Sequence, residues 1–135
     1  MTVDDPVVRM RAADAVEKAS RAQPDLLQPH KKTILTNVAT VVQSEVRWHL
    51  VQLIPRLRLT ANERKQAIAL LWSCLECRSK IVQVNAMQAL ADLAVQDGRL
   101  RKIVIERLRS LAVEGGPAVR ARARNLLRGS RNENA

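Results

Sequence analysis

Residues 46–54 read VRWHLVQLI, and this stretch recurs with small changes along the chain. The other copies are VRMRAADAV at 8–16, VQVNAMQAL at 82–90 and VRARARNLL at 119–127, so consecutive copies begin 38, 36 and 37 residues apart. Within each copy the apolar positions fall at i, i+4, i+7 and i+8, which places them on one face of an α-helix. A helical repeat of this period predicts a solenoid of stacked helix pairs.

Further apolar stretches with a helical rhythm lie between these copies, and no segment shows the alternation of a β-strand. Local signals mark where helices begin and end. They are Asp5-Pro6, Ser44, the Thr60–Glu63 capping box, Ser79 and Gly115-Gly116-Pro117. Pro55 is expected to bend or end its helix. The sequence therefore predicts an all-α chain of about seven helices, at 6–21, 24–42, 44–57, 60–77, 80–95, 98–114 and 117–128.

Length and composition favour one domain. The chain has 135 residues, of which 47% are hydrophobic, and it contains no Phe or Tyr, so its core must consist of Leu, Val, Ile and Ala. We expect a single domain over residues 1–128 and a flexible tail at 129–135. The sequence contains no run of about 18 apolar residues, so no membrane span is expected. The acidic start, MTVDDPVVRM, differs from a signal peptide, so a cytoplasmic location is expected.

The repeat resembles the HEAT-repeat family. The resemblance rests on Asp5-Pro6-Val7-Val8-Arg9, on Val46-Arg47 and Val119-Arg120, and on the small-plus-Leu pattern that follows each. It covers residues 5–129 and implies an α-α superhelix in which the second helix of each pair lines a concave surface. The four aligned copies would be those second helices.

Two columns of the aligned helices are polar in every copy, and we expect them to face solvent on the concave surface. They are Arg11, His49, Asn85 and Arg122, and Asp14, Gln52, Gln88 and Asn125. Such a stripe is either an ordinary solvated helix face or a groove for a partner. The candidate partner-binding residues are Arg11, Trp48, His49, Gln52, Arg56, Asn85, Gln88, Arg122, Asn125 and Arg128.

Trp48 and the arginines of another column each allow two interpretations. Trp48 is either an exposed anchor for a partner or a wedge between repeats beside Met10 and Val84. The column of Arg9, Arg47 and Arg120, where Gln83 stands in the third copy, is either a row of phosphate-binding groups or a ladder of hydrogen bonds to neighbouring loops. The HEAT resemblance favours the ladder. Trp72 is expected to pack in or beside the core.

The positive charge is uneven. The net charge is +10, and residues 99–135 hold 10 basic and 3 acidic groups, a net of +7. The last copy gathers Arg120, Arg122, Arg124, Arg128 and Arg131. This cluster suggests an anionic partner, because arginine binds phosphate and carboxylate bidentately. The alternative is a polar surface that keeps the outermost repeat soluble.

No catalytic, cofactor or metal motif stands out. Cys74 and Cys77 form a CxxC without the further ligands that zinc needs, and they end an apolar helical run, so they are expected to pack as small apolar groups. Some HEAT-type proteins are alkylpurine DNA glycosylases or relatives of phycobilisome lyases, but no residue-by-residue match to either active site is found. We therefore expect no catalytic residues, no cofactor and no metal.

Together these observations favour a non-enzymatic HEAT-repeat interaction module or scaffold that binds a protein, acidic in character, through its concave helix face. The alternative is electrostatic binding of nucleic-acid phosphates by the arginine-rich last repeat. A HEAT-like glycosylase or lyase is the least favoured hypothesis, and no membrane partner is expected. Because the chain begins and ends on a second-type helix, we expect a monomer or an end-to-end dimer.

Overall fold

The computed structural model describes the backbone of residues 4–133 and the side chains of residues 4–130. This part of the chain is all-helical, with 85% helix and no strand. The α-helices are α1 (Pro6–Ala22), α2 (Lys31–Thr40), α3 (Ser44–Leu53), α4 (Ala61–Leu75), α5 (Lys80–Ala94), α6 (Gly98–Glu114) and α7 (Pro117–Glu133), and η1 (Pro24–His30) and η2 (Ile54–Arg56) are 3₁₀ segments. The predicted fold class, an all-α and solenoid-like arrangement, is confirmed.

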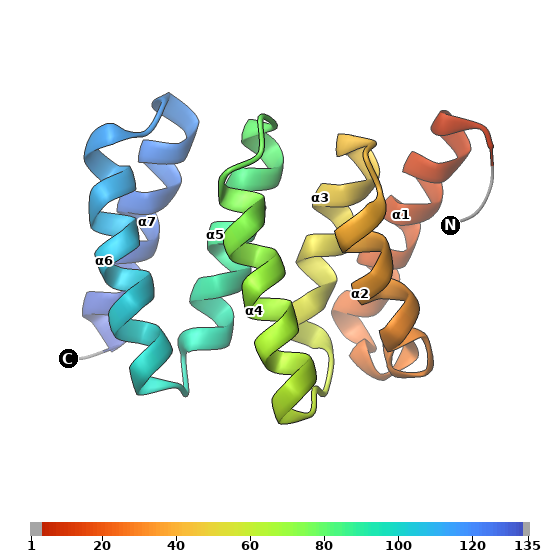
Figure 1. Ribbon diagram of the computed structural model, residues 1–135, viewed down its shortest axis with the longest axis horizontal. Helices are drawn as coiled ribbons and strands as arrows, with labels where there is room; N and C mark the ends of the chain where they lie inside the picture. The colour runs from red at the N-terminus through yellow and green to blue at the C-terminus, as the bar shows by residue number, and fades with distance from the viewer. Residues whose placement is uncertain (1–3, 134–135) are drawn as a thin grey trace.

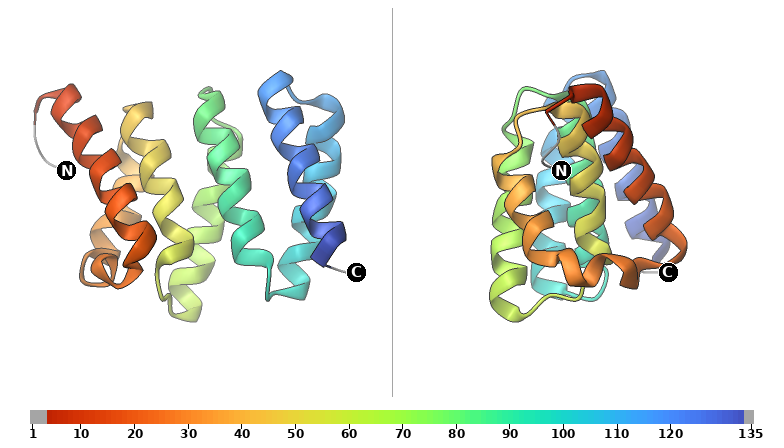
Figure 2. Two further views of the ribbon diagram at one scale, coloured as in Figure 1. Left: turned by 180° about the vertical axis from the view of Figure 1, so that it is seen from behind. Right: turned by 90° about the vertical axis from the view of Figure 1, so that its right-hand side faces the viewer.

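The helices form two layers (Figure 1). We call α1, α3, α5 and α7 the inner layer and α2, α4 and α6 the outer layer. Neighbouring inner helices pack directly on one another, whereas α4 and α6 scarcely touch. In the right-hand view of Figure 2, α1 and α7 stand out beyond α3 and α5, so the free side of the inner layer is concave. The four aligned segments thus lie where a concave surface forms.

Most of the predicted helix starts are confirmed by side-chain caps. Asp5 Oδ1 accepts a hydrogen bond from the N–H of Val7 at 2.9 Å. Thr60 and Glu63 form the reciprocal capping box, and Ser79 caps α5. Helix α3 begins at Ser44 as predicted, but the expectation that Ser44 is its N-cap is wrong, because Gln43 occupies the N-cap and makes no side-chain hydrogen bond there.

The larger differences between the predicted and the observed helix bounds occur at the prolines and at the last helix. The predicted helix 24–42 is divided into η1 and α2, because Pro29 has no N–H to continue an α-helical pattern. Pro55 ends α3 at Leu53, and the chain continues as the short η2. The predicted tail is helical as far as Glu133, while residues 134–135 lie outside the described residues.

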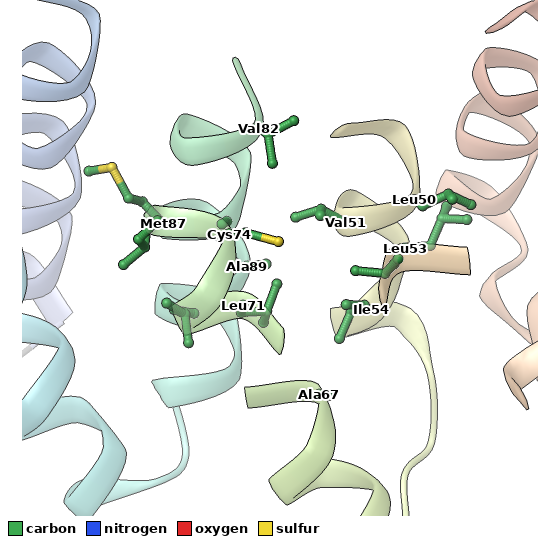
Figure 3. Close-up of a cluster of buried hydrophobic side chains, with 14 of the residues drawn as sticks. Leu50, Val51, Leu53, Ile54, Ala67, Leu71, Cys74, Val82, Met87 and Ala89 are labelled. Atoms are coloured by element: carbon green, nitrogen blue, oxygen red, sulfur yellow. The ribbon is translucent and has the colours of Figure 1, made fainter. Parts of the chain in front are cut away.

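The core lies between the two layers and is almost entirely aliphatic. Figure 3 shows its centre, where side chains of α3, η2, α4 and α5 meet. Val51, Ile54, Leu71 and Cys74 have no exposed surface there. Leucine, valine and alanine fill this thin layer without large rings, as the composition predicts.

Helix α1 packs with a different face from the one expected. Its predicted apolar face includes Val8 and Val16, which are 45% and 36% exposed. The residues buried against α3 are Ala13, Glu17 and Ser20. The difference arises because α1 has only the short η1 beside it, where each other inner helix has an outer helix. An apolar groove of about 370 Å³ remains between α1, η1, α2 and α3.

Candidate functional site

The concave surface is divided along the inner helices into an apolar and a polar part. We call its apolar part the apolar row. It consists of Val7, Met10, Trp48, Ile81, Val84, Ala118 and Ala121, all partly or fully exposed near the starts of the inner helices. The amide row follows one turn later and consists of Gln52, Gln88 and Asn125, with Asp14 in the same column on α1. The left-hand view of Figure 2 shows the four helices that carry these rows side by side.

Two candidate residues do not face solvent, contrary to the prediction. His49 is only 5% exposed and Asn85 only 8%. Both side chains point between neighbouring inner helices, because these helices pack closely and leave a narrow free stripe. Asn85 Nδ2 donates to the carbonyl of Ile81 at 2.8 Å, one turn back on its own helix. From the same column, Arg11 is exposed and Arg122 is partly buried.

Trp48 combines features of both interpretations. Its ring is partly buried and packs against the core, yet part of it remains exposed in the apolar row. It also stacks on His49, with ring centroids 3.6 Å apart and planes 30° apart. The two stacked rings lie on α3, one of the two central helices of the inner layer.

Arg56 is tied to α1 and does not stand free in a groove. Its Nη1 donates to the carbonyl of Glu17 at 2.8 Å and to Ser20 Oγ at 2.7 Å. The Glu17 carboxylate is 2% exposed and lies 2.8 Å from Arg21 and 3.6 Å from Arg56. Burial alone would raise the pKa of Glu17, but the hydrogen bond and charge of Arg21, together with Arg56, hold this pKa below its ordinary value. Arg56 therefore joins η2 to α1.

A second polar group lies beside this ion pair. His49 Nε2 is 3.9 Å from Asp14 Oδ1, while His49 Nδ1, Gln52 Oε1 and Glu17 Oε2 are buried without a hydrogen-bond partner in the described part of the chain. Burial lowers the pKa of His49 in spite of the nearby carboxylates. The imidazole is therefore neutral at pH 7, and the contact between α1 and α3 is unusually polar.

The other end of the concave surface contains a hollow of about 230 Å³ between α5, α6 and α7. Gln88 and Asn125 lie at its rim, and its walls include Ala91, Val104 and Leu126. Gln88 Nε2 donates to Asp92 Oδ1 at 3.0 Å and Gln88 Oε1 accepts from Arg122 at 3.4 Å. Arg128 donates to Asn125 Oδ1. Of the predicted residues, Gln88 and Asn125 thus line the hollow, and Arg122 and Arg128 are hydrogen-bonded to them.

The arginine column forms a ladder of hydrogen bonds in three of its four copies. Arg9 Nε donates to Gln43 Oε1 at 3.0 Å, and Arg47 Nε donates to the carbonyl of Val38 at 3.1 Å. Gln83 donates to the carbonyl of Cys77. Gln43 and Cys77 lie in the connections between the layers, as the structural interpretation predicted, whereas Val38 lies in the last turn of α2.

The cysteines pack as small apolar groups, as expected. Cys74 is fully buried and Cys77 is partly buried, and both are free thiols at the end of α4. Burial raises the pKa of the Cys74 thiol, so it stays protonated. Among the residues that the structure describes, no three His, Cys, Asp or Glu side chains lie close enough together to hold a metal ion.

Sequence reasoning missed the buried ion pair of Glu17. A usable signal was present, because Glu17 and Arg56 occupy nearly the same position in adjacent copies and have opposite charges. Adjacent copies pack side by side in a solenoid, so such a pair is placed to meet. The sequence contains no comparable signal that α1 packs with a different face from the one expected.

No protein-family model matches the chain, and neither the curated proteins nor the solved structures compared with it include a significant match. The fold and surface therefore define only a class, that of an all-helical, solenoid-like protein with a concave surface of mixed polarity. Within the described range no helix has both the length and the apolar character needed to cross a membrane.

Proposed function

We propose that the chain is a non-enzymatic HEAT-type interaction module that binds a protein segment along its concave surface. The observation that carries this proposal is the apolar row, which has members on all four inner helices. On α3 the exposed Glu45 occupies the column of Val7 and Ile81, so Trp48 alone continues the row there. Val7 and Ile81 in this row are 51% and 46% exposed. A contiguous exposed apolar surface marks an interaction site more often than isolated apolar residues do, and solenoids use their concave surfaces for extended ligands.

The two rows suit different parts of a polypeptide. The apolar row offers burial to side chains of the partner, with Trp48 at its centre as a large and rigid contact. The exposed amide of Asn125 can donate from Nδ2 to a carbonyl of the partner's backbone. Gln88 already bonds to Asp92 and Arg122, and Gln52 Oε1 is buried. The hollow beside Gln88 and Asn125 is lined by apolar side chains and by the charged Asp92 and Arg101, and it has room for one side chain of the partner.

The test is to select binding peptides from a random library on the purified protein and to measure their affinities for variants. Gly129 lies at the rim of the hollow, and a Cβ added there meets nothing within 4 Å. Gly129→Trp should therefore block the hollow without disturbing the fold. Ile81→Glu should place a charge in the apolar row. We expect each change to weaken the selected peptides by about tenfold or more, which is about 1.4 kcal/mol.

Val113→Trp is the matched control, because Val113 is 76% exposed on α6, away from the concave surface. It should leave the affinities unchanged. Peptides that bind Gly129→Trp and Ile81→Glu as well as the unchanged protein would contradict the proposal, as would a selection that enriches no peptide.

A further inference from the structure

Three arginines follow one side of α7 at intervals of one turn. Arg120, Arg124 and Arg128 are spaced i, i+4 and i+8, so they span roughly 12 Å of the helix. Arg124 and Arg128 are exposed and Arg120 is partly exposed. On the opposite side of the helix, Arg122 reaches Gln88 of α5. The row of three therefore faces away from α5.

Arg109 of α6 lies beside this row. Helices α6 and α7 are antiparallel neighbours (Figure 1), and Arg101 Nη2 donates to the carbonyl of Ser130 at 3.1 Å. With equal rise along both helices, Arg109 then stands level with residues 120–124. Arg109 is exposed and lies two turns along the same side of α6 as Arg101. We call Arg109, Arg120, Arg124 and Arg128 the arginine face.

No described carboxylate neutralises this face. Helix α7 has no acidic residue between Pro117 and Ser130. On α6, Glu106 stands three residues before Arg109 but lines the hollow beside Trp72 of α4 and forms no ion pair with Arg109. Glu114 accepts a hydrogen bond from Ser110 at 3.3 Å. Like charges at i and i+4 repel each other. The repulsion among the three arginines of α7 therefore destabilises the free protein, and a bound anion would relieve it.

Several other arginines of this protein have structural partners. Arg56 bonds to Glu17 and Ser20, Arg64 bonds to the carbonyl of Leu93 and to Asp97, and Arg47 bonds to a carbonyl of α2. Within the described residues, the arginine face makes one such bond, from Arg128 to Asn125. Its guanidinium groups are therefore available to an external ligand. The exposed Arg11, Arg78 and Arg99 also have no such partner in the described part of the chain, but they lie apart on different segments and form no row with one another.

We propose that the arginine face binds the phosphate backbone of a nucleic-acid duplex without reading its bases. Guanidinium groups match phosphate oxygens in a bidentate geometry, and a straight row of them suits a regular backbone. Single-strand binders rely on stacked aromatic rings, and the chain's two tryptophans lie elsewhere, Trp48 on the concave surface and Trp72 on α4. DNA and RNA duplexes share the phosphate chemistry, so both are tested.

The test is a fluorescence anisotropy titration with duplexes of about 24 base pairs, one of DNA and one of RNA. With three or four phosphate contacts, affinity should fall roughly 40- to 150-fold between about 50 and 200 mM salt. The variant Arg120→Gln/Arg124→Gln/Arg128→Gln should bind at least about tenfold more weakly at the lower salt, and its log–log salt slope should be shallower by about 2 to 3. Its melting temperature should not fall, because the repulsion within α7 is removed.

The matched control is Lys32→Gln/Lys65→Gln/Lys80→Gln, which removes the same charge from exposed positions on α2, α4 and α5. It should retain most of the affinity. Equal losses in both variants would overturn the proposal, as would the absence of duplex binding at the lower salt. Tighter binding of a polyglutamate of equal charge would assign the face to an acidic polypeptide instead. The hollow-blocking Gly129→Trp should leave duplex binding intact, which separates this proposal from the one for the concave surface.

Discussion

Glu17 places a negative charge between two inner helices, and its removal should be costly. The carboxylate is 2% exposed and faces Arg21 and Arg56. In Glu17→Gln the largely buried Arg56 would lose its counter-charge, so we expect the free energy of unfolding to fall by about 2 kcal/mol. Urea denaturation followed by circular dichroism would measure this change.

The control for Glu17 is a carboxylate in an exposed ion pair. Glu76 lies 3.0 Å from Arg107, with 74% of its side chain exposed. Glu76→Gln should change the unfolding free energy by no more than about 0.5 kcal/mol. Similar effects in the two variants would show that burial of the Glu17 pair does not matter for stability.

At the scale of the helix, the turn between α6 and α7 contains two glycines with different surroundings. A Cβ added at Gly115 would lie 2.7 Å from the carbonyl oxygen of Leu111 and 2.8 Å from Val119 Cγ1. Val119 is 2% exposed and has no room to move. Gly115→Ala should therefore lower the unfolding free energy by about 1–3 kcal/mol.

Gly116 is the matched position, because an added Cβ there meets nothing within 4 Å and neither glycine has a positive φ. Gly116→Ala should be neutral or stabilise the fold by up to about 1 kcal/mol, because alanine lowers the conformational entropy of the unfolded chain. Thermal denaturation of both variants would show the difference. If the two alanines had the same effect, close packing of this turn would be refuted.

Helix starts were more predictable from the sequence than helix ends. The caps of Asp5, Thr60 and Ser79 act within three residues, so their signal is contained in the local sequence. The end of α7 depends on contacts made in three dimensions, such as the bond from Arg101 to Ser130. Nothing in the residues after Arg128 indicates that contact.

At the scale of the whole molecule, acidification should weaken the fold in two stages. Burial lowers the pKa of His49. Below about pH 6.5 the unfolded chain therefore binds a proton at this residue that the folded protein does not, and the free energy of unfolding falls. The pKa values of Asp14, Glu17, Glu63 and Asp97 are also lowered, that of Glu63 to about 2. Their contribution to the free energy of unfolding is complete above about pH 4.5 and is lost as the pH falls through their pKa values in the folded protein.

Urea denaturation at a series of pH values would measure both stages. His49→Gln should remove the decline that begins below about pH 6.5 and leave the decline below about pH 4.5 in place. His30 is exposed, so His30→Gln should leave both stages unchanged. A first stage that persists in His49→Gln would show that another group causes it.

The repeat predicted the architecture, but not which residues of the candidate site face the concave surface. Neighbouring positions on a helix differ by about 100°, so a small rotation exchanges Trp48 for His49 on the free stripe. The two central inner helices, α3 and α5, are covered on three sides, and the polar residues His49 and Asn85 are buried there. Their polarity alone therefore could not distinguish the concave surface from the contact between helices.

The unequal spacing of the two layers gives this molecule a preferred direction of bending. The inner helices already touch, which makes the solenoid stiff against tighter curling. Between α4 and α6 there is a shallow hollow of about 350 Å³ beside Trp72 and Ile103, which leaves room for these outer helices to approach each other. A ligand that straightens the curve would press these two side chains together. The fluorescence of Trp72 would then report the curvature of the whole molecule.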